Sequence, residues 1–404
     1  MPNFFFIVSS VLFCAHGYFF FKLRQAFGGG LWQAPVVVFI LSMMGLLLFR
    51  RHDLFGSLSQ QLTGVAYIWL GFLLFASLIF LASDFLAVLR ILLKAIAGLN
   101  VIWPSAAFRA VLCLFLASGL TGYAFYSAHT PQLRHVVIGS SKLPANLSVP
   151  EQLTLGPEPF TPGQEQLTPE SDQRLRIVAI SDVHLSESLG VDFLGKIAAL
   201  VESQKPDIIA ITGDLVDTDM SGRSADAAIL RSLTARYGKY AVIGNHEVHR
   251  GLASARAFIA ESGFTLLENR AVLDASGIVV VGVNDRSMRE VGADSADPVA
   301  IIKKFPAAST RFVLMLKHRP LMSQDEIGLV DLQLSGHTHG GQVWPGSYLA
   351  KAANNDVEQG LTVYSREGQG ETNLYLSNGV GYWGPPMRFL APAEITVIDL
   401  ISQP

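Results

Sequence analysis

The chain has only two cysteines among its 404 residues. Both, Cys14 and Cys113, lie in apolar stretches of the first half. The second half therefore contains no disulfide and no thiolate metal site. The chain also lacks an excess of basic residues, because 30 Lys and Arg stand against 33 Asp and Glu. After residue 130 the chain carries 23 basic and 31 acidic residues, and this acidic balance argues against a nucleic-acid-binding face.

Charge is scarce in the first 130 residues, which carry seven basic and two acidic residues. Each of four apolar runs there is close to the ~20 residues that cross a bilayer as a helix. The runs are Phe4–Phe21, Leu31–Phe49, Thr63–Ala82 and Ala106–Ala128. Lys22 and Arg24 follow the first run, whereas a secretory signal has its positive charge before the run. We therefore expect residues 1–130 to form a transmembrane region of about four helices.

The segment 84–100 separates the third run from the fourth. Arg90 and Lys94 are four residues apart on one helical face, among Leu, Ile and Val. This pattern predicts a separate helix lying in the membrane interface, with a fifth crossing as the alternative. No acidic residue falls in the middle of a crossing, so we expect anchoring, oligomerisation or lipid access rather than an ion path. Lys and Arg divide almost equally between the two sides, so the side of the C-terminal domain stays undetermined.

The rest of the chain reads as a linker and a second domain. Residues 131–174 are expected to hold a first strand and then a linker rich in Pro, Gln and Glu, with 141–173 acting as a lid or a spacer. From 175 to 404, short apolar runs such as "LRIVAI" and "DIIAIT" alternate with helical patterns. This alternation predicts a layered α/β domain.

Polar side chains follow the expected strands, where ligands bind in open α/β sheets. They are Asp182, His184, Asp214, Asn245, His246, His318, His337 and His339. Oxygen and imidazole donors without sulfur suit Mn²⁺, Fe or Zn²⁺. The set is too large for one ion that must also hold water, but it suits two ions sharing a carboxylate. Two ions ~3.5–4 Å apart can generate hydroxide at neutral pH and clamp phosphoryl oxygens.

Taken singly, most of these patterns are weak. Asp-x-His and Gly-Asp after a strand are commonly turns, and a lone His318 is more often a core or surface residue. Gly-His-x-His is stronger, because a histidine pair framed by glycines has few structural uses. The order of the patterns, each after an apolar strand, carries the prediction.

Five motifs in sequence order resemble the calcineurin-like metallophosphoesterase superfamily. They are "SDVH" (181–184), "TGDLVD" (212–217), "GNHE" (244–247), "KHRP" (317–320) and "SGHTHGGQ" (335–342). The tail "YWGPPMRFLAPAEITVIDL" resembles a membrane-associated, multi-pass bacterial branch of that family. The resemblance implies an α/β fold in which transmembrane helices precede a two-sheet β-sandwich flanked by helices, with a dinuclear metal centre on one rim.

The resemblance also implies roles for individual residues. The first divalent ion would be bound by Asp182, His184 and His339. The second would be bound by Asn245, His318 and His337. Asp214 would bridge the two ions, and His246 would contact phosphoryl oxygens or protonate the leaving oxygen as general acid.

Four further residues near the motifs are weaker candidates. Asp285 ends an expected strand and would fix the orientation of a metal ligand without binding the ion itself. His249 would line the mouth of the site. Lys317 and Arg319 flank His318 and would bind a substrate phosphate; a solvated pair of charges is the alternative.

Together these features predict a metal-dependent phosphoesterase. It would hydrolyse a phosphodiester, pyrophosphate or phosphomonoester by in-line attack of a metal-bridging hydroxide. A catalytic domain joined to membrane helices favours a lipid-linked substrate, the lipid bilayer as a partner, and a multi-pass location in a bacterial inner membrane. The alternative is a non-catalytic membrane scaffold or sensor that keeps the phosphoesterase fold. Such proteins lose ligand histidines, and none is missing here.

Overall fold

The computed structural model describes residues 2–30, 33–49, 57–143, 174–186, 189–293 and 296–403. Most of the expected linker, 144–173, lies outside the described residues. The chain divides into two compact units. One comprises Met1–Ala128 with Trp383–Phe389, and the other comprises His129–Tyr382 with Leu390–Pro404.

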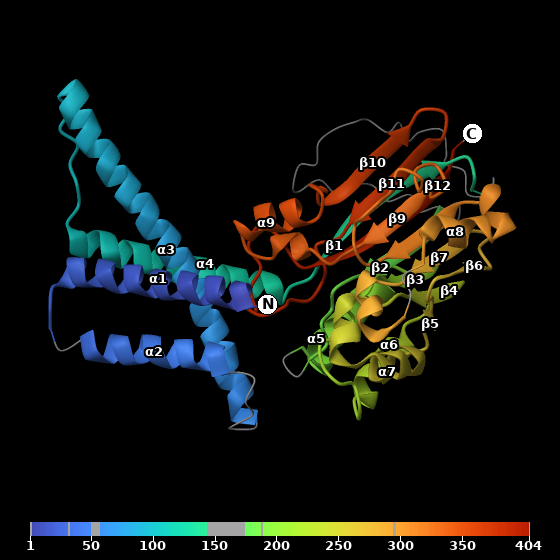
Figure 1. Ribbon diagram of the computed structural model, residues 1–404, viewed down its shortest axis with the longest axis horizontal. Coiled ribbons are helices and arrows are strands. Elements are labelled where there is room, and N and C mark those ends of the chain that lie inside the picture. Colours follow the sequence, from blue (N-terminus) through green and yellow to red (C-terminus); the bar gives the residue numbers. More distant parts are fainter. Residues whose placement is uncertain are drawn as a thin grey trace. The chain divides into compact units, whose positions relative to one another are not determined.

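The first unit is helical (Figure 1). Its helices are α1 (Pro2–Phe27), α2 (Gln33–Phe49), α3 (Ser57–Ala97) and α4 (Ala106–Ala128). Within the described residues, two segments are long and apolar enough to cross a membrane, Leu62–Ala97 and Ala106–Ala128. The prediction of a separate interfacial helix over 84–100 was wrong, because α3 continues unbroken to Ala97. Neither Gly nor Pro occurs between Asp84 and Ala97, and the helix ends before Gly98, which has a positive φ of 68°.

The buried face of α4 is a stripe of small residues. They are Ala110, Cys113, Ala117, Thr121, Ala124 and Ala128. Small side chains at this helical spacing let neighbouring backbones approach closely in a helical bundle. A segment distant in sequence, Trp383–Phe389, packs in the same unit. The Arg388 amide donates to the Ala124 carbonyl at 2.8 Å, and the Phe389 ring meets the Phe75 ring edge-on.

A charged group lies within the long helix α3. Asp84 accepts hydrogen bonds from Lys22 Nζ at 2.5 Å and from the Tyr18 hydroxyl at 2.8 Å. The sequence placed Asp84 beyond the third crossing, whereas the structure includes it in the continuous apolar helix. The Asp84 side chain is 44% exposed, and its charge is paired with that of Lys22 of α1.

The second unit contains two six-stranded sheets. The first has the order β1 (Gln132–Ser140), β12 (Glu394–Ser402), β2 (Arg174–Ile180), β3 (Ile208–Ile211), β4 (Gly238–Ala241) and β5 (Thr265–Leu266). The second has the order β10 (Gly360–Arg366), β11 (Gly370–Leu376), β9 (Leu332–Ser335), β8 (Val313–Lys317), β7 (Val279–Val283) and β6 (Arg270–Leu273). In each sheet, four neighbouring strands run parallel: β2, β3, β4 and β5 in the first, and β11, β9, β8 and β7 in the second.

The two sheets share one hydrophobic core. Alternate residues of β7 and β8, such as Val280 and Leu314, pack with Ile177 and Ile208 of the first sheet. The intervening residues, such as Val281, face a second cluster that includes α8 (Pro298–Lys303). This two-residue alternation explains why both faces of β7 are apolar.

Helices and short turns complete this unit. Helices α5 (Val191–Ser203), α6 (Ser224–Ser232) and α7 (Asn245–Glu261) lie beside the first sheet (Figure 1). The remaining elements are η2 (Arg286–Val291), η3 (Pro306–Ser309), η4 (His339–Gly341) and α9 (Gly346–Ala353). The predicted fold class, a two-sheet α/β sandwich flanked by helices and preceded by apolar helices, is confirmed.

Candidate metal centre

Parallel strand ends gather the motif residues. Asp182 and His184 follow β2, Asp214 follows β3, and Asn245 begins α7 just after β4. In the second sheet, His318 directly follows β8, and the two histidines of "GHTH" follow β9. Because the carboxyl ends of parallel neighbours share one edge, the loops of each sheet converge.

The backbone at these residues is strained. Five non-glycine residues of the site have a positive φ: Asp182 (53°), His184 (51°), Asp214 (51°), His337 (76°) and His339 (51°). A side chain disfavours this region, at about 1–3 kcal/mol per residue. The surrounding fold must therefore enforce these conformations, and such strain gathers at functional sites.

Two glycines allow close approach of these loops. A Cβ on Gly336 would lie 2.1 Å from Asp182 Oδ2, and one on Gly244 would lie 2.2 Å from Asp214 Oδ1. Neither carboxylate has room for a side chain there. The glycines of "GHTH" and "GNHE" are thus explained by their approach to the two aspartates.

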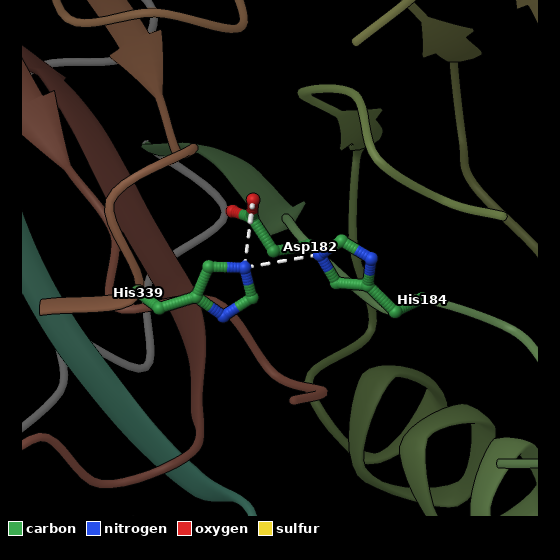
Figure 2. Close-up of side chains that lie close together, drawn as sticks. All are labelled: Asp182, His184 and His339. Atoms are coloured by element: carbon green, nitrogen blue, oxygen red, sulfur yellow. Dashed lines mark hydrogen bonds and ion pairs between the residues drawn. The ribbon is translucent and has the colours of Figure 1, made fainter. Parts of the chain in front are cut away.

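The first group of converging donors is Asp182, His184 and His339 (Figure 2). His184 Nε2 and His339 Nε2 lie 3.0 Å apart, and His339 Nε2 lies 3.6 Å from Asp182 Oδ1. All three side chains are buried or nearly so. One ligand atom from each of the three side chains lies within 4.8 Å of the others, so the group could hold one metal ion.

The second group is Asp214, His318 and His337, with Asn245 beside it. His318 Nε2 lies 3.2 Å from Asp214 Oδ2, 3.2 Å from Asn245 Oδ1 and 3.2 Å from His337 Nδ1. These oxygen and nitrogen atoms also form a donor set suited to a divalent ion.

Asp214 lies between the groups. Its Oδ2 atom is 3.9 Å from His184 Nε2 of the first group and 3.2 Å from His318 Nε2 of the second. The structure therefore brings all seven predicted donors together, with one carboxylate facing both groups. The residues present fit two divalent ions.

Protonation differs between the groups. Burial raises the pKa of Asp182 to about 6 and lowers the pKa of His184 to about 4. At neutral pH both are then in the form that binds metals. Burial opposes a charged His318, but the Asp214 carboxylate outweighs it and raises the pKa of His318 to about 10. The same ion pair holds the pKa of Asp214 well below its usual range, against the effect of burial.

His246 is oriented by a carboxylate and stands next to the first group. Its Nδ1 lies 2.7 Å from Asp217 Oδ1, and its ring packs edge-on against His184 with centroids 4.5 Å apart. Arg250 Nε donates to the same Asp217 oxygen at 3.0 Å. Burial opposes protonation, but Asp217 outweighs it and raises the pKa of His246. A protonated, partly exposed imidazole is suited to donate a proton.

Two residues of the site were missed in the sequence, Asp217 and Glu247. Asp217 is the second aspartate of "TGDLVD", and its place three residues after Asp214 was the available signal. Glu247 is fully buried and accepts hydrogen bonds from the amides of Asp214, Val216 and Gly244. It sits at the third position of α7, where its bond from the Gly244 amide caps the start of the helix. Glu247 thereby fixes the Asp214 loop to the helix.

Of the four weaker candidates, Asp285 and Arg319 lie at the second donor group, whereas Lys317 and His249 do not reach either group. Asp285 caps η2, accepts from Ser287 N, and pairs with Arg319 Nε at 2.8 Å. Arg319 reaches the second group, whereas Lys317 pairs with the buried carboxylate of Glu326. His249 lies near Glu290 on the surface, outside both groups.

Comparison with known proteins agrees with this geometry. Residues 175–341 match the family model described as "Calcineurin-like phosphoesterase". A relative from Aquifex aeolicus (strain VF5), named "Uncharacterized metallophosphoesterase", is 33% identical over 56% of this chain and 85% of its own length. The chain belongs to the calcineurin-like phosphoesterase family.

Longer relatives share the same domain. A Helicobacter pylori (strain J99 / ATCC 700824) protein, also named "Uncharacterized metallophosphoesterase", is 35% identical over 57% of this chain and 61% of its own length. A Danio rerio protein named "Transmembrane protein with metallophosphoesterase domain" is 31% identical over 57% of this chain and 54% of its own length. The chain thus matches somewhat more than half the length of these two relatives.

Proposed function

We propose that the protein is a phosphoric ester hydrolase that depends on two divalent metal ions. The observation that carries the proposal is the pair of buried donor groups with Asp214 facing both. When bound, such ions would lower the pKa of water and neutralise charge on phosphoryl oxygens. Asp182, His184 and His339 would hold one ion, and Asn245, His318 and His337 the other. The absence of sulfur donors favours Mn²⁺, Fe or Zn²⁺.

His246 is the proposed general acid. Its ring stands beside the first group, and Asp217 orients Nδ1. Water would attack phosphorus opposite the leaving oxygen, and His246 would donate a proton to that oxygen as the bond breaks. Asp217 and Arg250 would hold the imidazole in place. Asp285 would hold Arg319 in place beside the second group through their ion pair.

The proposed location is a membrane, crossed several times by the N-terminal helices, in a bacterial inner membrane. The apolar helices within Leu62–Ala97 and Ala106–Ala128 support it, as does the word "Transmembrane" in the name of the Danio rerio relative. A hydrolase domain on the same chain as such helices would meet substrates at the bilayer surface. We therefore propose a lipid-linked phosphodiester or pyrophosphate as the substrate class.

The test uses the full-length protein in detergent, stripped of metal and reloaded with Mn²⁺, Zn²⁺ or Fe²⁺. Hydrolysis of bis-p-nitrophenyl phosphate and p-nitrophenyl phosphate is compared between the wild type and Asp214→Asn. The variant keeps the shape of the side chain but removes the charge facing both groups, so turnover should fall below detection. Metal-dependent turnover in the wild type would then justify a screen of lipid phosphates.

Two outcomes would contradict the proposal. Asp214→Asn with wild-type turnover would rule out a role for both donor groups. A wild type that binds two ions but hydrolyses neither these esters nor any lipid phosphate in the screen would indicate a non-catalytic protein that keeps the phosphoesterase fold.

A further inference from the structure

Arg319 connects a buried carboxylate to the second donor group. Its Nε atom donates to Asp285 Oδ2 at 2.8 Å, and the Asp285 side chain is 1% exposed. At the other end of the guanidinium, Nη1 lies 2.5 Å from His337 Nε2 and Nη2 lies 3.4 Å from Asn245 Oδ1. One end of the side chain is thus anchored by an ion pair, and the other points into the site.

Lys317, the other cation beside His318, has a different environment. Its Nζ lies 3.2 and 3.1 Å from the two oxygens of Glu326, whose side chain is 4% exposed. Lys317 is therefore neutralised within the domain, and of the two cations beside His318, Arg319 is the one that reaches the donor groups.

The contact between Arg319 and His337 is compatible with only one form of the histidine. His337 Nδ1 faces His318 Nε2 within the second group, whereas Nε2 faces Arg319. If Nδ1 binds an ion, the neutral imidazole carries its hydrogen on Nε2. Nε2 then cannot accept a hydrogen bond, and Arg319 Nη1 needs another acceptor. The ion pair with Asp285 does not depend on this change.

We propose that Arg319 binds a non-bridging oxygen of the substrate phosphoryl group, with Asp285 as its positioning residue. The inference rests on the proposed function, because it assumes that a phosphate ester occupies this site. Arginine is suited to the task, because it keeps its charge at all relevant pH values and its planar fork matches phosphate oxygens. Anchoring by Asp285 restricts the side chain before substrate arrives, which lowers the entropic penalty of binding.

The test measures phosphate binding separately from turnover. Full-length wild type and Arg319→Gln are loaded with the same metal, and their affinity for inorganic phosphate is measured by isothermal titration calorimetry. Bound metal is counted by mass spectrometry. Loss of one charge-assisted hydrogen bond in a partly buried site should raise the Kd for phosphate and the KM for ester about 10-fold or more. The bound metal should stay at the wild-type level.

Arg311→Gln is the matched control. Arg311 is an exposed arginine two residues before β8, and Arg319 stands two residues after it. The control should leave the Kd for phosphate within twofold of the wild type. Arg319→Lys keeps the charge but loses the fork, so it should recover part of the affinity. It also provides a second measurement if the glutamine variant folds poorly.

Two results would overturn the inference. The Kd for phosphate and the KM of Arg319→Gln could match those of Arg311→Gln, which would place the guanidinium away from substrate. Alternatively, Arg319→Gln could lose an ion, which would make Arg319 a support for the metal ligands. Failure of the proposed function can be told apart from failure of this inference, because phosphate affinity is measured without turnover. A wild type that hydrolyses no ester, but binds phosphate more tightly than Arg319→Gln does, would contradict the proposed function and not the role of Arg319 in binding phosphate.

Discussion

The two donor groups of the metal centre resemble one another in composition but differ in protonation at neutral pH. In the first group, burial lowers the pKa of His184 to about 4 and raises that of Asp182 to about 6. At neutral pH neither of these two side chains has a proton to lose when it binds an ion. In the second group, His318 forms an ion pair with Asp214, which raises its pKa to about 10 despite burial. The second group must therefore lose a proton before it can bind a cation.

The difference follows from placement rather than residue type. Asp214 Oδ2 is 3.2 Å from His318 Nε2 but 3.9 Å from His184 Nε2. The closer histidine takes the charge, and the guanidinium of Arg319 adds a fixed positive charge on the same side. Equal numbers of histidines thus produce one position ready for a metal ion and one at which protons compete with it.

The largest effect is expected from removing one histidine ligand of either group. His184→Ala should abolish binding at the first and His318→Ala at the second, so each variant should hold one ion per chain instead of two. Each should lose about 10³-fold or more in turnover, since a bound ion supplies several kcal/mol of transition-state stabilisation. Mass spectrometry and steady-state kinetics would measure both quantities. Two bound ions in either variant would contradict the division into groups.

A smaller effect is expected from the proposed general acid. His246→Gln should lower turnover about 10²-fold for esters with poor leaving groups, and much less for p-nitrophenyl esters, whose leaving oxygen needs little protonation. Metal content should stay at two ions, because His246 contacts His184 without joining the first group. Asp217→Asn should show the same dependence on the leaving group, but more weakly. An equal loss with both kinds of ester would rule out the role in proton transfer.

The smallest effect is a difference in pH dependence. His318→Ala isolates the first position and His184→Ala the second. Metal affinity at the second should rise about tenfold per pH unit from roughly pH 7 to 9, because His318 stays protonated below its raised pKa and each ion displaces one proton. Affinity at the first should change little over the same range. Calorimetry in buffers of different ionisation enthalpy counts the protons, and equal slopes would contradict the comparison.

Much of the site could be predicted from the sequence, because each motif ends a parallel strand. Loops at one edge of a sheet must meet, so the convergence of Asp182 and Asp214 needed no tertiary information. His318 follows a strand of the second sheet, so its approach to them depends on how the two sheets pack. The positive φ angles of five site residues could not be predicted, since tertiary packing imposes them. The different partners of Lys317 and Arg319 were equally hidden. Both are cations beside His318, and only the positions of Glu326 and Asp285 separate them.

The helical unit was predictable in outline only. Apolar runs indicated its helices, but the continuation of α3 past Asp84 depends on the pairing of this carboxylate with Lys22 of another helix. The packing of Trp383–Phe389 in the same unit, far along the chain, could not be read from hydropathy. Local composition indicates which residues avoid water, whereas these contacts depend on partners distant in sequence.

The central claim is that the two groups hold a pair of ions that share Asp214. Electron paramagnetic resonance of the Mn²⁺-loaded, full-length protein tests this directly. Two ions ~3.5–4 Å apart, linked through one carboxylate, should give the spectrum of an exchange-coupled pair, and Asp214→Asn should weaken the coupling. Two uncoupled Mn²⁺ signals, or one ion per chain at saturation, would contradict the account.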